Sequence, residues 1–374
     1  PKYIENGVPF ITSKHLTDNG IDFTETNYIS EENHIEFSKR SKVDNGDILF
    51  GMIGTIGKPV IVNTDFEFSI KNVALLKLSS NELLSNIYVL NLLKSNIIIN
   101  QFLKLSNGGV QSFIALGMIR KLKIPLPPIE EQKKIADILS TVDKKIAFVE
   151  ENINATEELK KALMQKLLTE GIGHTEFKDS ELGRIPQSWE VVKFKEITKV
   201  RQGLQIPISK RKKEKCENCY EYITIQFIKN NKEVEYIENP QKTVICTEND
   251  ILMTRTGNTG IVVTNVKGVF HNNFFLIDFD RNEISKEYLV YYLNSNSIQK
   301  EILLRAGATT IPDLNHGDFY SIKFISPPLE EQKQIAEILS TVDNKLENLK
   351  EKKQSFEELK KGLMQKLLTG EVRV

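Results

Sequence analysis

The sequence predicts an α+β protein in which two α/β heads are joined by two long antiparallel helices, forming an internal repeat about a pseudo-twofold axis. Three observations support this prediction. One 43-residue segment occurs twice, each copy has the apolar spacing of a long helix, and each copy follows a stretch of short strand patterns. A chain of 374 residues is also long enough for more than one core.

The repeat defines the domain organisation. Residues 127–169 and 327–369 are identical at 28 of 43 positions, at a constant offset of 200. The segments that precede the two copies are less similar to each other; residues 43–49, for example, resemble residues 248–252. We therefore divide the chain into a first head (1–126), a first rod (127–171), a second head (172–326) and a second rod (327–374).

Each rod has the signals of a single helix. The Pro-Pro pairs at 127–128 and 327–328 suit a helix start, and the acidic pairs that follow complement the helix dipole. Gly171 and Gly370 supply stops. A narrow apolar stripe of this length needs a partner helix. We expect the two rods to form an antiparallel coiled coil; the alternative is two separate helical linkers.

The heads have strand patterns separated by turn residues. We expect helices at 81–103 and 285–304, each of which starts near Ser or Asn, and a connector at 182–189. The expected strands are 8–11, 47–50, 60–62 and 73–78 in the first head, and 222–225, 260–263 and 274–277 in the second.

The second head has about 35 residues before its segment at 220–224. The first head, by contrast, begins at the position that matches this segment, without the preceding residues. We therefore expect the opening N-terminal part of the first head to be missing from this sequence.

Composition excludes few functions. Lys+Arg and Asp+Glu balance at 50 each, so any polyanionic partner must be recognised by local charge. No apolar run approaches the roughly 18 residues of a membrane span, and no secretory leader opens the chain. Three cysteines argue against a disulfide framework and favour a cytoplasmic location.

Catalytic signatures are not found. The Gly-containing residues 51–57 lack the Lys-Ser/Thr of a phosphate loop and favour a hairpin turn. Cys216 and Cys219 form a lone C-x-x-C pair, whereas zinc needs four ligands. The five histidines are scattered. We expect no catalytic residue and no metal site.

The ordered repeat resembles a known family. A head, then a rod that begins Pro-Pro-[Ile/Leu]-Glu-Glu-Gln-Lys and closes Leu-Met-Gln-Lys-Leu-Leu-Thr, occurs twice. This order resembles the specificity subunit of type I restriction–modification systems. Residues 183–190, Gly-Arg-Ile-Pro-Gln-Ser-Trp-Glu, also resemble the start of a head in that family. The resemblance covers nearly the whole chain.

The resemblance implies a non-catalytic DNA-binding subunit whose heads are target recognition domains, each of which reads half of a bipartite double-stranded site. It implies that the rods set the spacing and dock two modification (methyltransferase) subunits, which motor–nuclease restriction subunits join. S-adenosylmethionine, ATP and Mg²⁺ would belong to those partners, with no cofactor here. The alternatives are the specificity half of a single-chain restriction–methylation enzyme and a purely structural scaffold.

Local charge and side-chain type indicate which residues could contact DNA. Residues 190–215 contain nine Lys/Arg against three Glu, which suits phosphate contact but also a solvated loop. Arg, Gln and Asn make informative contacts with bases. The expected DNA-binding residues are Lys14, His15, Thr55, Lys58, Gln111, Lys210, Arg211, Lys212, Lys213, Gln226, Arg255, Thr256, Asn258, Thr309 and Thr310.

The two rods remain more alike than mutual packing requires, which favours two copies of one partner. The apolar stripe along each rod has two interpretations: it packs against the other rod, or it binds a partner protein. The expected partner-binding residues are Glu157, Leu159, Leu163, Met164, Glu357, Leu359, Leu363 and Met364.

Overall fold

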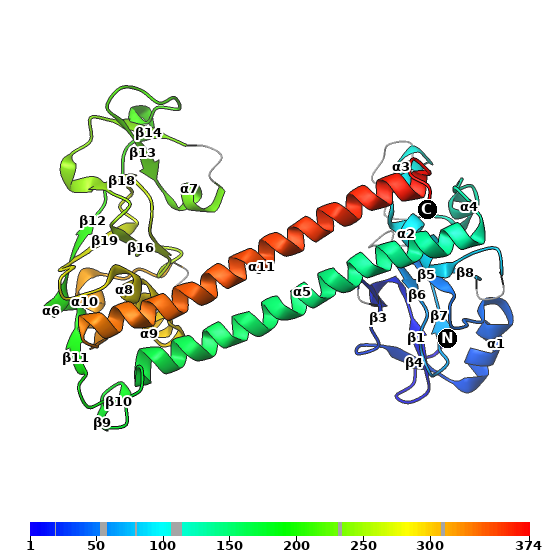
Figure 1. Cartoon of the computed structure of the whole chain (residues 1–374), viewed down its shortest axis with the longest axis horizontal. Helices are drawn as coiled ribbons and strands as arrows, with labels where there is room; N and C mark the ends of the chain where they lie inside the picture. The colour runs from blue at the N-terminus through cyan, green and yellow to red at the C-terminus, as the bar shows by residue number, and fades with distance from the viewer. Residues whose placement is uncertain (19, 53–57, 79–80, 106–113, 231–233, 308–310) are drawn as a thin grey trace. The chain divides into compact units, whose positions relative to one another are not determined.

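The computed structural model describes residues 1–374 except 19, 53–57, 79–80, 106–113, 231–233 and 308–310 (Figure 1). The chain divides into two compact units, one of residues 1–152 with 349–374, and one of residues 153–348. Each long helix therefore contributes one end to each unit. Among the described residues, no helix is long and apolar enough to cross a membrane.

Unit 1 contains two small three-stranded sheets, in the orders β4-β1-β7 and β6-β5-β8. β1 runs parallel to β7 and antiparallel to β4, and β5 is antiparallel to both neighbours. The elements before the rod are β1 (Val8–Ile11), η1 (Ser13–His15), β2 (Leu16–Thr17), β3 (Gly20–Ile21), β4 (Asn27–Ile29), α1 (Glu31–Ser41), β5 (Ile48–Gly51), β6 (Pro59–Ile61), β7 (Ser69–Ile70), β8 (Val73–Leu76), α2 (Asn86–Lys94), α3 (Asn96–Leu105) and α4 (Leu116–Arg120).

Unit 2 repeats this plan with extra strands, in the orders β14-β13-β18-β15 and β12-β19-β16-β17. β13 runs parallel to β18 as β1 does to β7. Its elements are β9 (Phe177–Ser180), β10 (Gly183–Pro186), β11 (Glu190–Lys193), α6 (Phe194–Ile197), β12 (Thr198–Gln202), η2 (Ile208–Lys210), β13 (Cys219–Ile223), α7 (Ile225–Asn230), β14 (Tyr236–Glu238), η3 (Lys242–Val244), β15 (Ile245–Cys246), β16 (Ile251–Thr254), β17 (Val262–Val263), β18 (Gly268–Phe270), β19 (Phe274–Phe279), α8 (Lys286–Leu293), α9 (Asn296–Ala306), α10 (His316–Ser321) and β20 (Lys323–Ser326).

The predicted rods are single helices, α5 (Ile129–Glu170) and α11 (Leu329–Thr369). Each ends one residue before a glycine with positive φ, 67° at Gly171 and 77° at Gly370. Glycine adopts this left-handed conformation without a Cβ clash, so it closes the helix. The sequence-based helix stops are confirmed.

The helices pack antiparallel in unit 1. The ammonium of Lys360 lies 2.6 Å from the Asp143 carboxylate, and that of Lys353 lies 3.0 Å from Glu150. The two helices therefore run in opposite directions in this unit, as predicted.

The same direction holds in unit 2. Leu167, near the end of α5, and Ile335, near the start of α11, belong to one buried core. The ammonium of Lys160 also lies 2.5 Å from Asp343.

The two predicted head helices are each broken in two. The range 81–103 contains α2 and most of α3, and the range 285–304 contains α8 and most of α9. Ser295 causes the second break, because its hydroxyl accepts the backbone N–H of Ile298 and thus caps α9. Ser95 stands at the matching place, where its hydroxyl donates to the Leu92 carbonyl.

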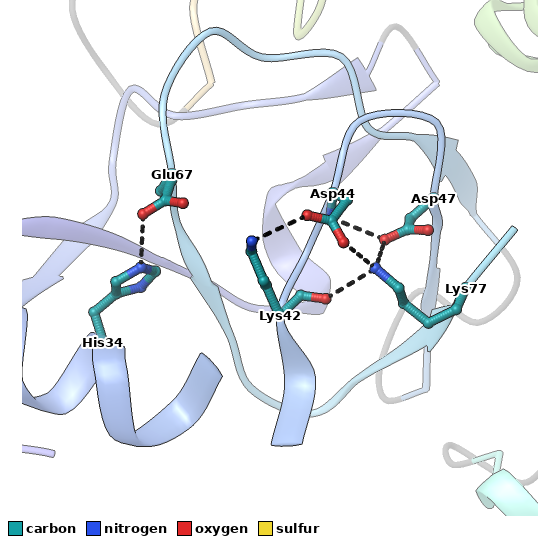
Figure 2. A network of polar contacts seen from close by, with 6 residues as sticks. All are labelled: His34, Lys42, Asp44, Asp47, Glu67 and Lys77. Atoms are coloured by element: carbon teal, nitrogen blue, oxygen red, sulfur yellow. Dashed lines mark hydrogen bonds and ion pairs between the residues drawn. The ribbon is translucent and has the colours of Figure 1, made fainter. Parts of the chain in front are cut away.

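A charged network fixes the turn before β5 (Figure 2). The ammonium of Lys77 lies 2.5 Å from Asp44 and 2.6 Å from Asp47, whose side chain is fully buried. The hydrogen bond from Lys77 lowers the pKa of Asp44. Asp250 holds the corresponding turn of unit 2, where it accepts the backbone N–H of Thr247 at 2.8 Å. Asp44, Asp47 and Asp250 therefore hold these turns in place.

Cys216 and Cys219 are joined by a disulfide, with their Cα atoms 5.1 Å apart. The cysteine count did not predict this bond. Cys246 is free and buried, and burial raises the pKa of its thiol to about 11.

Candidate nucleic-acid interface

The loop after β16 is held against a second loop of the same head. The Arg255 guanidinium donates to Asp313 at 2.9 Å, and the Thr256 hydroxyl donates to the same carboxylate at 2.5 Å. The backbone N–H of Leu314 donates to the Arg255 carbonyl at 2.8 Å. Two segments far apart in sequence are thereby joined, with the side chain of Asn258 exposed on the loop.

The turn after β18 connects this loop to α7. The Arg255 N–H donates to the Asn273 carbonyl at 2.7 Å, and the His271 N–H donates to the Ile223 carbonyl at 3.0 Å. Ile223 ends β13, and α7, which carries the exposed Gln226, follows directly. The backbone therefore places the candidates Asn258 and Gln226 on neighbouring segments.

The first head builds the same framework. The Ile114 N–H donates to the Met52 carbonyl at 2.8 Å, as Leu314 does to Arg255, and the Lys71 N–H donates to the Ile11 carbonyl at 2.9 Å, as His271 does to Ile223. The exposed Lys14 lies on η1, directly after β1. Lys71 is also exposed. Sequence analysis did not include Lys71 among the candidates, because it lies in no local run of charge.

Besides Thr256, whose hydroxyl is bonded to Asp313, three candidates are engaged inside the fold. His15 is 4% exposed, and its ring nitrogens lie 2.9 Å from the Thr12 N–H and 3.2 Å from the Glu25 carbonyl. Arg211 donates to Glu235 and Ile206 and lies over the Tyr222 ring. Arg255, described above, also covers the Phe275 ring. Their contacts explain these side chains without DNA, so we omit His15, Arg211 and Arg255 from the residues proposed to touch it.

The lysines at 210, 212 and 213 of the basic segment are all exposed. Lys212 also forms an ion pair with Glu238 at 2.6 Å. In the first head, Lys58 lies 3.2 Å from Asp18. Four further candidates lie outside the described residues, namely Thr55, Gln111, Thr309 and Thr310.

The partner candidates on the rods fall into two groups. Leu163 and Met164 pack against the core of unit 2, and Leu363 and Met364 pack against the core of unit 1. One turn earlier, Leu159 and Leu359 are each 49% exposed. Glu157 and Glu357, two residues before them, are also exposed. The two rods thus present the same outward surface.

A buried anchor that the sequence did not reveal fixes the second head to its rod. The Trp189 indole donates to Glu331 at 2.8 Å, and the His174 ring nitrogen lies 2.7 Å from the other oxygen of this carboxylate. Glu331 occupies the first turn of α11, where we expected only helix-dipole electrostatics. The Glu-Glu-Gln sequence at the start of the rod does not by itself show which other segment of the chain contacts α11.

Among the residues that the structure describes, no group of three or more His, Cys, Asp or Glu could hold a metal ion. The two heads share one backbone framework, and this framework carries different side chains in each head.

Comparisons with known proteins agree. The family model of the type I restriction modification DNA specificity domain matches residues 2–158 and 186–358. The MjaX and MjaVIII type I restriction enzyme specificity subunits of Methanocaldococcus jannaschii are 32% and 29% identical, over 98% and 100% of this chain and 88% and 91% of theirs. The type I restriction-modification S subunit from M. genitalium has the same fold, with a TM-score of 0.57 and 16% identity, over 98% of this chain and 90% of that one.

The chain belongs to the family of type I restriction–modification specificity subunits. It is a DNA-recognition subunit and is not itself an enzyme.

Proposed function

We propose that each head reads one half of a bipartite double-stranded DNA site, with the rods setting the distance between the halves. The observation that carries this proposal is the backbone framework that the two heads share. In it η1 corresponds to α7, the turn at Lys71 to the turn at His271, and the backbone of Met52 after β5 to that of Arg255 after β16. Because the side chains on these segments differ between the heads, the two half-sites should differ in sequence.

The contacts are proposed to divide by chemistry. Exposed lysines suit phosphate oxygens, which position a protein on DNA without reading its sequence. We assign Lys14, Lys210 and Lys213 to that role. Gln226 and Asn258 carry amides, which can bond adenine in the major groove. We assign these two side chains to base reading in the second head.

The rods are proposed to dock two modification (methyltransferase) subunits, one on each outward surface. Leu159 and Leu359 support this stoichiometry, because two apolar side chains with equal exposure stand at equivalent places. Because the exposed leucine recurs at the same place in both rods, it suits one kind of partner that is bound twice. Motor–nuclease restriction subunits would join this complex.

The small-molecule chemistry is proposed to lie on those partners. Methyl transfer needs S-adenosylmethionine, and translocation with cleavage needs ATP and Mg²⁺; we assign all three to the modification and restriction subunits. We place the assembled complex in the cytoplasm.

Removing two exposed lysines of the basic segment tests the DNA contact. For Lys210→Ala combined with Lys213→Ala, we expect weaker DNA binding, with the slope of log K against log salt reduced by about 2, because each lost phosphate contact releases about 0.9 fewer counterions. Fluorescence anisotropy across a salt series, on the complex with its modification partner, measures this slope.

The matched control replaces an exposed rod lysine, Lys352→Ala, which should leave the slope unchanged. An unchanged slope in the double variant would show that this segment is a solvated loop. A loss of preference for one sequence over another would show that these lysines read bases.

A further inference from the structure

The basic segment contains a loop that presents apolar side chains to solvent. In this loop, residues 203–210, Ile208 is 77% exposed and Leu204 is 43% exposed. Pro207 is exposed as well, whereas Ile206 is buried. Single exposed apolar residues are common on protein surfaces, but three on one short loop indicate a surface that something covers.

Hydrogen bonds to the core fix the backbone of this loop. The Ile206 N–H donates to the Tyr222 hydroxyl at 2.9 Å, and that hydroxyl donates to the Leu204 carbonyl at 2.8 Å. The Arg211 guanidinium donates twice to the Ile206 carbonyl and lies over the Tyr222 ring. The Arg211 N–H also donates to the Ile208 carbonyl at 3.0 Å. Because the backbone on both sides of Ile208 is held, little conformational entropy is lost when a partner covers this side chain.

The start of the loop lies against the end of β18. The Leu204 N–H donates to the Phe270 carbonyl at 3.1 Å. The turn that follows β18 is bonded to the loop that carries Asn258 and to the end of β13, which is followed by α7 with Gln226. The apolar loop therefore neighbours the segments whose side chains we assign to base reading.

Exposed lysines accompany the apolar side chains. Lys210 ends the loop, and Lys213 and Lys215 follow it, all three with exposed side chains. Duplex DNA offers both chemistries, phosphate oxygens for the lysines and stacked base faces for the apolar groups. Ile, Leu and Pro are among the side chains that proteins insert between stacked bases. The positive charge therefore favours DNA over an apolar protein surface as the partner of this loop.

We propose that Ile208, supported by Leu204 and Pro207, is an apolar wedge that enters the base stack at one step beside the half-site of the second head. The proposal rests on the proposed function, because the second head must first be bound to DNA. Lys210 and Lys213 would hold nearby phosphates while Ile208 partly unstacks the step. Since unstacking is easiest at flexible pyrimidine–purine steps, the wedge adds a sequence preference at a position that no polar side chain reads.

Fluorescent base analogues test the wedge on the complex of the full chain with its modification partner. The probe is a duplex with the chain's own methylation motif. It carries 2-aminopurine at one adenine or pyrrolocytosine at one cytosine, moved in turn through the half-site of the second head and its flanks on both strands. Both analogues brighten when they unstack. The methylated adenine is left unlabelled, because methyltransferases turn that base out of the stack themselves.

With the unaltered chain, we expect the fluorescence at one step to rise by at least about twofold over that of the free duplex. Ile208→Ala should abolish this rise and weaken binding of the motif about tenfold, because the apolar contact with the bases is lost. Ile208→Leu should keep the rise, because it retains the apolar volume.

Leu182→Ala is the matched control, because Leu182 is an exposed apolar residue on the turn between β9 and β10 of the same unit. It should leave both the fluorescence and the affinity unchanged. Circular dichroism checks that the variants fold.

Specific binding without any rise, or an equal rise with Ile208→Ala, would overturn the wedge and leave the proposed function intact. Equal binding of the motif and of a random duplex would contradict the proposed function, and the wedge with it. If Ile208→Ala weakened binding of the modification subunit without DNA, the loop would belong to a protein interface and the wedge would be wrong.

Discussion

Trp189→Ala is expected to lower the free energy of unfolding of unit 2 by about 3–5 kcal/mol, the usual cost of truncating a large buried aromatic side chain. Trp189 is completely buried and shares a core with Leu168 and Phe194. The substitution also removes the N–H donor to Glu331. Hydrogen exchange of backbone amides in 153–348 measures the effect unit by unit.

Trp189→Phe separates the two contributions. It keeps most of the apolar volume and removes only the indole N–H, so we expect a smaller loss of about 1–3 kcal/mol from the one Glu331 oxygen that loses its donor, while the other oxygen keeps His174. Amides of 1–126 should keep their protection in both variants. If Trp189→Ala cost less than 1 kcal/mol, the anchor between head and rod would be peripheral to the stability of unit 2.

The second large effect concerns the rods. Combining Leu159→Asp with Leu359→Asp should weaken the binding of modification subunits by roughly 100-fold or more, because a carboxylate would be buried in each apolar contact. Both side chains are half exposed, so the free chain should stay folded. Calorimetric titration with purified modification subunit gives the affinity and the number of sites.

Each single variant sharpens this test. Leu159→Asp or Leu359→Asp alone should leave one strong site, which reduces the stoichiometry from two to one. As a control, Glu151→Gln, which is exposed on the same helix but is not among the predicted partner-binding residues, should leave both sites unaltered. Two unaltered sites in the double variant would place the partner elsewhere on the chain.

The sequence predicted the repeated architecture because periodicity and helix stops are local signals. The rods and their ends at Gly171 and Gly370 follow from such signals, whereas their antiparallel direction was inferred from the internal repeat. The breaks at Ser95 and Ser295 were missed, because apolar spacing continues across both and only the capping geometry ends each helix.

The site was harder to predict than the fold. Residue type nominates Arg255 and His15 for DNA contact, but their partners, Asp313 and Glu25, become visible only when distant or looping segments meet. The role of Glu331 was missed for the same reason, since Trp189 is 142 residues away in sequence. Conversely, the exposed Lys71 lies outside any charge run.

Mapping of methylated bases tests the central claim most directly. The chain would be produced with its modification partner in cells that lack other methyltransferases, and the genome would be sequenced for modified adenines. We expect one motif of two short unlike halves separated by a fixed gap, with replacement of residues 174–326 by the second head of a relative changing only one half. A continuous motif, or a replacement that changes both halves, would contradict the proposal that each head reads one half-site.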